Sequence, residues 1–294
     1  MSHNHEVILN ENFELGEGPI WCANRKVLFW VDLLQGQLHT YDPAASADGL
    51  IQLDQAIGTV VPCEAGGLML ALQHGFAHLD LESGKVKMLH DPESDKPANR
   101  FNDGKCDPAG RFWAGTMDFD AAPEAGNLYC LDLDGSVSHK FDKVSVSNGI
   151  VWNSQCDTMY FVDTLTKRVD AFDYDNATGQ ISNRRAVVKT EGEPGYPDGM
   201  SIDADDNIWV AMWEGNGVIC WDPRTGKKLD KIELPANRTT ACAFAGDNLD
   251  ELYITSASTK LSPEQLKEQP HAGNLFRAHP GVTGTKSQAY RGAV

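Results

Sequence analysis

Short apolar segments recur along the chain at nearly constant intervals. Each has the composition of a buried strand, rich in aromatic and β-branched residues and bounded by Gly, Pro, Asn or Asp. Their central residues lie about 40 to 49 positions apart: Phe29, Met69, Trp113, Tyr160, Trp209 and Tyr253. This period is typical of the four-stranded blades of a β-propeller, so the pattern predicts six repeats.

A second series of apolar segments follows the first in step. Its members occupy residues 38–42, 76–80, 128–132, 169–173, 218–222 and 275–279. Five of the six end in Asp and the last ends in His279, and turn-forming residues follow most of them. Two series that keep the same spacing indicate paired strands in every repeat.

Helical patterns are nearly absent, apart from residues 262–268, where Ser262 precedes Pro263 as a cap precedes the first helical position. Many short strands with Gly and Pro turns predict an all-β fold, and six repeats predict a six-bladed β-propeller with a central channel. No linker divides the sequence, so residues 1–294 are expected to form one domain. We expect residues 6–9 to pair with the last blade and close the ring.

Composition narrows the class of protein. Hydrophobic residues make up 41% and charged residues 23%, as in soluble globular proteins, and no apolar run approaches the ~20 residues of a membrane helix. The polar first ten residues do not resemble a signal peptide. Seven widely spaced cysteines predict buried free thiols in a reducing compartment, so a cytoplasmic location without membrane contact is expected.

The net charge of the protein indicates which class of ligand it binds. A net charge of −17 argues against nucleic acid, since binding a polyphosphate requires Lys and Arg to displace counterions. A small molecule or a cation is the better prediction, and no obligate protein partner is expected.

Four repeats carry an oxygen-bearing residue followed by Gly ahead of an apolar strand: Glu17-Gly18, Asp103-Gly104, Asn148-Gly149 and Asp198-Gly199. We interpret these dipeptides as turns that place the side chains at the entrance of the channel, where the first strands of the blades converge. Crowded carboxylates raise one another's pKa values unless a cation neutralises them. The oxygen set therefore predicts a divalent ion such as Ca²⁺, Mg²⁺, Mn²⁺, Fe²⁺ or Zn²⁺ at the channel mouth.

A structural explanation competes with this one, because Asp-Gly and Asn-Gly are common in hairpin turns. A purely structural turn should recur in all six repeats. The second and sixth repeats lack the dipeptide, at residues 63–66 and 240–243, and one site residue is Glu17, a type that turns do not favour. These differences favour a site.

Longer motifs resemble one known family. They are Gly16–Trp21, Arg100–Lys105, Asp107–Met117, Ser147–Gly149 and Pro197–Met200. Together they look like the senescence marker protein (regucalcin), gluconolactonase and luciferin-regenerating-enzyme-like family, over about residues 13 to 280. The resemblance implies a six-bladed propeller that holds one divalent metal and hydrolyses a sugar lactone such as gluconolactone or a pentonolactone.

The resemblance also implies roles for particular residues. Glu17, Asn148 and Asp198 match the family's metal ligands, and Asp198 matches its general acid/base. Arg100 and Asn102 match residues that contact substrate hydroxyls.

The roles of two further positions follow less directly from the resemblance. Asp120 is the nearest equivalent of a substrate-contacting Glu in the family, with a shorter side chain. The repeat pattern offers Asp103 as a further ligand, whereas the resemblance favours Asn102. Because successive strand residues face opposite ways, we expect only one of the two to reach the site.

Other functions remain open at the level of sequence. The same scaffold would suit phosphotriester hydrolysis, and a calcium-binding regulatory protein of the regucalcin type is an alternative from another class. A protein-interaction scaffold is disfavoured by the concentrated polar positions. Trp213 lies near a loop and is a candidate for the pocket wall.

Overall fold

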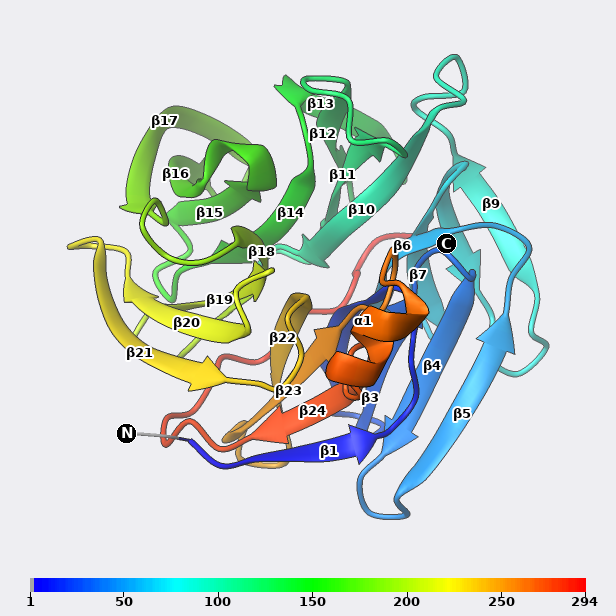
Figure 1. Cartoon of the computed structure of the whole chain (residues 1–294). Helices are drawn as coiled ribbons and strands as arrows, with labels where there is room; N and C mark the ends of the chain where they lie inside the picture. The colour runs from blue at the N-terminus through cyan, green and yellow to red at the C-terminus, as the bar shows by residue number, and fades with distance from the viewer. Residues whose placement is uncertain (1–2) are drawn as a thin grey trace.

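The computed structural model describes residues 3–294. Six four-stranded antiparallel sheets stand around a central channel, as Figure 1 shows in a view along that channel. The predicted all-β six-bladed propeller is confirmed. Each blade runs from an inner strand at the channel to an outer strand at the rim.

The first three blades follow the chain without interruption. Blade one contains β2 (Gly16–Cys22), β3 (Val27–Asp32), β4 (Gln37–Asp42) and β5 (Ala47–Gln52). Blade two contains β6 (Ile57–Pro62), β7 (Leu68–Leu72), β8 (Gly75–Leu79) and β9 (Val86–His90). Blade three contains β10 (Asn99–Cys106), β11 (Phe112–Asp118), β12 (Gly126–Leu131) and β13 (Val137–Val144).

The remaining blades complete the ring. Blade four contains β14 (Ser147–Trp152), β15 (Thr158–Asp163), the 3₁₀ turn η1 (Thr164–Thr166), β16 (Arg168–Asp175) and β17 (Gln180–Lys189). Blade five contains β18 (Tyr196–Ile202), β19 (Ile208–Trp213), β20 (Gly217–Asp222) and β21 (Lys227–Glu233). Blade six contains β22 (Thr239–Ala245), β23 (Glu251–Ser256), β24 (Leu275–Ala278) and β1 (His5–Leu9), with α1 (Pro263–Glu268) between β23 and β24.

The two ends of the propeller meet in blade six. Strand β1 pairs antiparallel with β24, with Val7 opposite Phe276, so the first strand of the chain is the outer strand of the last blade. The predicted closure by residues 6–9 is confirmed. The short helix is also confirmed, since Ser262 caps α1 with a capping box to Gln265.

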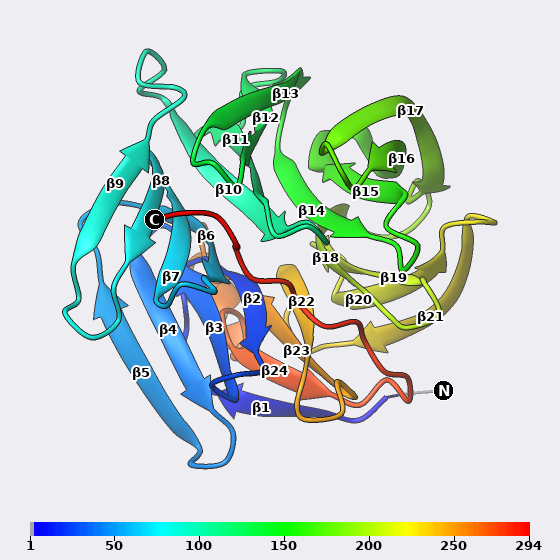
Figure 2. The same ribbon diagram turned by 180° about the vertical axis from the view of Figure 1, so that it is seen from behind.

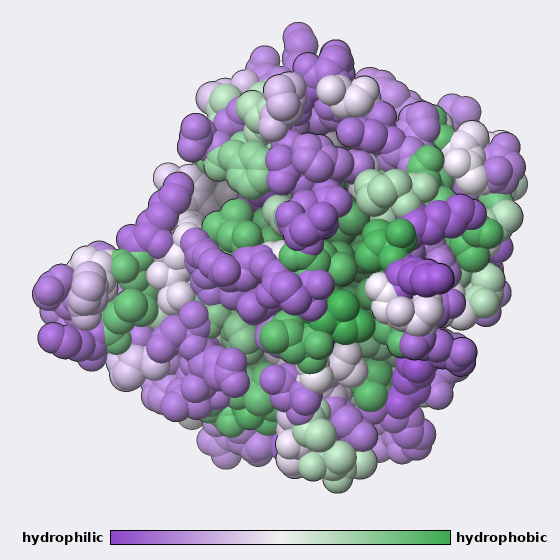
Figure 3. All heavy atoms as spheres, turned by 90° about the vertical axis from the view of Figure 1, so that its right-hand side faces the viewer, coloured by the Kyte–Doolittle hydropathy of each residue, from purple (hydrophilic) through white to green (hydrophobic). Residues whose placement is uncertain are grey.

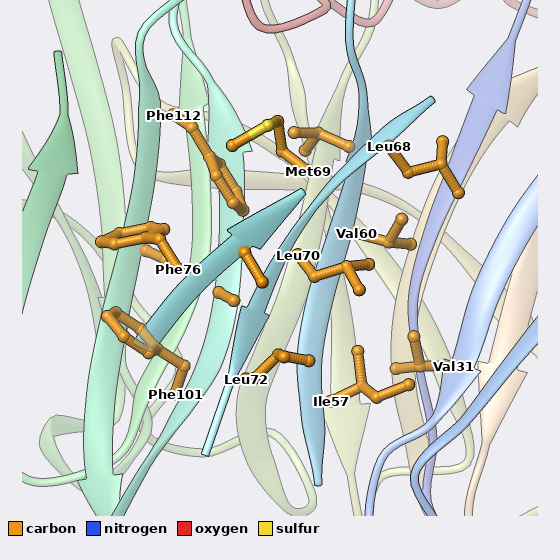
Figure 4. Packing of buried hydrophobic residues seen from close by; sticks show 14 of the residues in the cluster. Val31, Ile57, Val60, Leu68, Met69, Leu70, Leu72, Phe76, Phe101 and Phe112 are labelled. Carbon is orange, nitrogen blue, oxygen red and sulfur yellow. The ribbon is translucent and has the colours of Figure 1, made fainter. Parts of the chain in front are cut away.

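The core lies between neighbouring blades. Figure 4 shows β7 with Leu70 and Val60 on one side and Phe76, Phe101 and Phe112 on the other. The ring centroids of Phe76 and Phe101 are 4.7 Å apart, which joins blade two to blade three. Six of the seven cysteines are buried and none is in a disulfide, as expected. No helix within residues 3–294 is long and apolar enough to cross a membrane.

The oxygen-bearing residues do not lie on turns, which corrects our interpretation. They lie inside the inner strands, at β-bulges where the pairing with the second strand shifts. The adjacent Gly allows the inner strands to approach closely: a Cβ on Gly199 would come within 2.5 Å of Ala241 Cβ. A Cβ on Gly149 would come within 2.5 Å of Met200 Cγ.

The bulges also correct the repeat register. In blade three the bulge runs from Phe101 to Gly104, which places Asn102, and not Asp103, in the position held by Asn148 in blade four. In blade two the same position is Gly58, whereas residues 63–66 form the turn between β6 and β7. In blade six it is Thr240, as expected.

The C-terminal segment, residues 279–294, crosses the end of the propeller opposite α1, as Figure 2 shows. Its backbone bonds to blades two, three, five and six, and the fully buried Tyr290 donates its hydroxyl to Asp132 O at 2.9 Å. Within the channel, Lys105 Nζ of β10 donates to Met200 O of β18 at 3.0 Å. The lysine thus links blade three to blade five above this segment.

Candidate active site

Five predicted residues converge on one cavity at the end of the channel that carries α1. Glu17, Arg100, Asn102, Asn148 and Asp198 all line a cavity of about 310 Å³. They come from four inner strands and all are buried, with 3–5% exposure. We call the three residues Glu17, Asn148 and Asp198 the floor of the cavity.

The floor presents polar oxygens without protein partners. Asn148 Oδ1 and Asp198 Oδ1 are buried and accept no hydrogen bond from the residues that the structure describes. Asn148 Nδ2 donates to Thr164 Oγ1 at 2.9 Å, which fixes the amide group. Because an unpaired buried oxygen is costly, this arrangement is typical of a site that receives a cation or a ligand.

The electrostatics of the floor also favour a bound cation. Burial, followed by repulsion from neighbouring carboxylates, raises the pKa of both Glu17 and Asp198. Asp103 is among the neighbours that repel them. Burial lowers the pKa of Arg100 to about 10, against the opposing attraction of Glu17 and Asp198. A divalent cation would relieve the repulsion that these carboxylates exert on each other.

The donor set fits a hard divalent ion. The candidates to hold one are the carboxylates of Glu17 and Asp198 and the amide oxygen of Asn148, all oxygen donors. No group of three or more His, Cys, Asp and Glu residues suited to a metal occurs within residues 3–294. The candidate set therefore depends on the amide of Asn148 as its third member.

Arg100 and Asn102 form a connected pair beside the floor. Arg100 Nη1 donates to Asn102 Oδ1 at 2.6 Å, and Asn102 Nδ2 donates to Ser147 O at 2.6 Å. Arg100 Nε is buried without a partner among the described residues. The guanidinium therefore retains donor capacity for a ligand while Asn102 fixes its orientation.

The structure shows where Asp103 and Asp120 lie relative to the cavity. Asp103 does not line the cavity, and its Oδ1 accepts from Gly104 N at 2.7 Å, so of the pair only Asn102 reaches the site. Asp120 lines the cavity but is exposed, at the rim rather than the floor.

Several lining residues were not anticipated from sequence. Thr164 and Leu165 belong to η1, and Phe119 and Tyr196 belong to loops or strand ends, where no periodic pattern marks a side chain as facing a pocket. Trp213, predicted as a candidate for the wall, does line the cavity.

The fold and the cavity together define a six-bladed propeller with a buried, oxygen-rich site at one end of its channel. The chain belongs to the SMP-30/gluconolactonase/LRE-like family, whose profile matches residues 15–258. Regucalcin from Homo sapiens is 40% identical over 293 residues, which is 98% of each protein.

Solved structures agree with this assignment. A luciferin-regenerating enzyme superimposes with a TM-score of 0.93 at 31% identity, over 99% of this chain and 100% of that one. A calcium-binding protein, regucalcin, from Agrobacterium tumefaciens superimposes with a TM-score of 0.94 at 28% identity, over 99% of this chain and 98% of the other. The family resemblance inferred from the motifs is confirmed.

Proposed function

We propose that this protein is a metal-dependent lactonase that opens a sugar lactone to the aldonic acid. The observation that carries the proposal is the pair of unpartnered oxygens, Asn148 Oδ1 and Asp198 Oδ1, beside the partly free guanidinium of Arg100. Membership in a family that includes gluconolactonases supports it. A small sugar lactone is the proposed ligand, since a net charge of −17 disfavours nucleic acid.

Glu17, Asn148 and Asp198 are the residues that would hold the cation. A divalent cation bound there would supply Lewis-acid activation of the ester carbonyl and favour ionisation of water. The proposed cations are Ca²⁺, Mg²⁺, Mn²⁺, Zn²⁺ and Fe²⁺, because oxygen ligands accept each of them.

The protein residues provide proton transfer and substrate orientation. Asp198 accepts a proton from the attacking water as the water oxygen bonds to the carbonyl carbon. The bond between the carbonyl carbon and the ring oxygen then breaks, and Asp198 returns the proton to the ring oxygen. The product is a hydroxy acid. Arg100, held by Asn102, orients the substrate by donating hydrogen bonds to its hydroxyl oxygens.

A calcium-binding regulatory role is the second candidate. It is favoured by the Agrobacterium relative, which is described as a calcium-binding protein. This role requires the floor to bind the cation but requires no turnover. The two candidates therefore differ in whether a lactone is consumed.

The test begins with metal-stripped protein resupplied separately with each of the five cations. Hydrolysis of gluconolactone and of pentonolactones is followed by proton release. We expect one or more cations to restore turnover, and we expect Glu17→Ala to abolish it. Glu82→Ala, at an exposed position outside the cavity, is the matched control and should keep full activity. Tight cation binding without turnover of any lactone would overturn the lactonase and favour the calcium-binding role.

A further inference from the structure

The open end of the cavity carries apolar side chains beside the exposed Asp120 and Lys260. Its wall includes five large apolar or aromatic side chains that we call the mouth residues: Leu34, Phe119, Leu165, Tyr196 and Trp213. They come from blades one, three, four and five. Figure 3 shows the side of the propeller at blades one and two, where apolar areas lie among hydrophilic ones.

Two of the mouth residues are exposed to solvent. Phe119 is 38% exposed and Leu165 is 45% exposed, which is uncommon for large apolar side chains in this protein. Neither belongs to the hydrophobic clusters between the blades, so burial of the core does not explain them. Exposed apolar side chains that gather around a pocket indicate a ligand with an apolar part.

The three aromatic rings of the mouth each lie beside a cation. The distances from the charged group to the ring centroid are 5.5 Å for Arg100 and Phe119, 4.1 Å for Lys167 and Tyr196, and 5.2 Å for Arg238 and Trp213. Such contacts weakly favour the observed ring positions at exposed sites. The cation lies over one face of each ring, and the remaining ring surface belongs to the cavity wall.

We propose that the mouth residues form a subsite for an alkyl substituent on the lactone ring, so that the site accepts alkyl-substituted lactones in addition to the sugar lactones proposed above. This inference rests on the proposed lactonase function. It assigns Phe119, Leu165 and Trp213 as determinants of specificity.

The depth of the cavity supports this placement. The ester group reacts at the floor, where Asp198 is 4% exposed, so the rest of the ring and its substituents extend toward the mouth. An alkyl chain that reaches the mouth would remove its own surface and that of Leu165 from water. Asp120 and Lys260, also on the cavity wall, are exposed and keep their contact with water.

The experiment compares δ-valerolactone, which has no substituent, with δ-nonalactone, which carries a butyl group beside the ring oxygen. We expect kcat/KM to be about tenfold higher for δ-nonalactone, as expected for partial burial of several methylene groups. The difference should reside mainly in KM. Equal kcat/KM values for the two lactones, or a preference for δ-valerolactone, would overturn the subsite.

Leu165→Asn tests the location of the subsite. We expect it to reduce the preference for δ-nonalactone about threefold to fivefold, because it places a polar amide at the mouth. The matched control is Leu229→Asn, since Leu229 is 53% exposed on β21 and does not line the cavity. The control should keep the preference of the wild type, and an unchanged preference in Leu165→Asn would overturn the assignment.

A binding measurement separates this inference from the proposed function. If no lactone is hydrolysed, the lactonase fails, and the unreactive lactams 2-piperidinone and 6-butyl-2-piperidinone still test the subsite. We expect the butyl lactam to bind at least fivefold more tightly, with a change in tryptophan fluorescence that is smaller in Trp213→Phe. Equal affinities would overturn the subsite whatever the outcome of the hydrolysis assay.

Discussion

Asn102 and Arg100 act as one unit: Asn102 Oδ1 accepts from Arg100 Nη1 at 2.6 Å while Asn102 Nδ2 is bonded to Ser147 O. Most of the hydrogen-bonding capacity of Asn102 is thus used within the protein. In the proposed lactonase, its contribution to substrate binding would pass largely through the orientation of Arg100. The inner strand of blade three is in this way connected to that of blade four.

Asn102→Ala should therefore weaken substrate binding more than it slows the chemical step. We expect KM for gluconolactone to rise about tenfold, the loss of one charge-assisted hydrogen bond, with kcat within about threefold of the wild type. Steady-state kinetics measure both constants. The exposed Asn4→Ala is the control and should change neither. A fall in kcat with an unchanged KM would contradict the positioning role.

Asp198→Asn should separate proton transfer from cation binding. The amide keeps an oxygen donor at the floor but cannot accept the proton, so we expect kcat to fall by about 10²–10⁴-fold. Asp103→Asn, outside the cavity, is expected to lose less than tenfold. Turnover of lactone at saturating cation is the measurement. Wild-type turnover in Asp198→Asn would remove the residue from the mechanism.

Cation binding should release protons. Burial and repulsion from neighbouring carboxylates raise the pKa of Glu17 to about 8 and raise that of Asp198 as well, so Glu17 holds a proton at neutral pH when no cation is bound. A bound cation requires the ionised forms, so its affinity should increase as the pH rises through the neutral range. Titration calorimetry in two buffers of different ionisation enthalpy measures the protons released. Glu17→Gln should release fewer, and no release from the wild type would contradict the argument.

His39 should make stability depend on pH. Its ring stacks on Trp30 at 4.8 Å with 3% exposure, and burial lowers its pKa to about 4. Between the ordinary value of 6.5 and this value, the unfolded chain binds a proton that the folded protein does not. Stability is therefore complete above pH 6.5 and decreases as the pH falls toward 4, by about 3 kcal/mol.

The check is urea unfolding of wild type and His39→Phe between pH 7 and pH 4. The phenylalanine cannot titrate, so the difference in unfolding free energy should shift by about 3 kcal/mol in favour of the variant at low pH. Asn24→Phe, at an exposed position with no titratable side chain, should show no such shift. Parallel curves for the wild type and His39→Phe would contradict the prediction.

Much of the fold was predictable because it repeats. The strands centred on Phe29, Met69 and their four equivalents can be located from their regular spacing and apolar composition. The closure of the ring by β1 follows from the topology of a propeller. The bulges were not predictable. An Asp-Gly pair has the same local preferences in a turn and in a bulge, and only the close approach of Ala241 to Gly199 decides between them.

The site was predictable in part. Glu17, Asn148 and Asp198 converge because they occupy equivalent positions of inner strands, which a repeat pattern can locate. Asn102 and Asp103 could not be separated by that pattern, since the choice depends on where the bulge shifts the pairing. Trp213 was anticipated at the cavity wall, whereas Leu165 was not, because its exposure follows from tertiary structure and no local sequence pattern marks it.

Lys105 bonds to Met200 across the channel and also lines a second cavity beside the C-terminal segment, which shares no lining residue with the site cavity. In the proposed lactonase, substrate would therefore enter and product would leave past the mouth residues. An acid product that stays in the cavity would block the next lactone. At high product concentration, turnover would then depend on how fast the hydroxy acid leaves the cavity past the mouth residues.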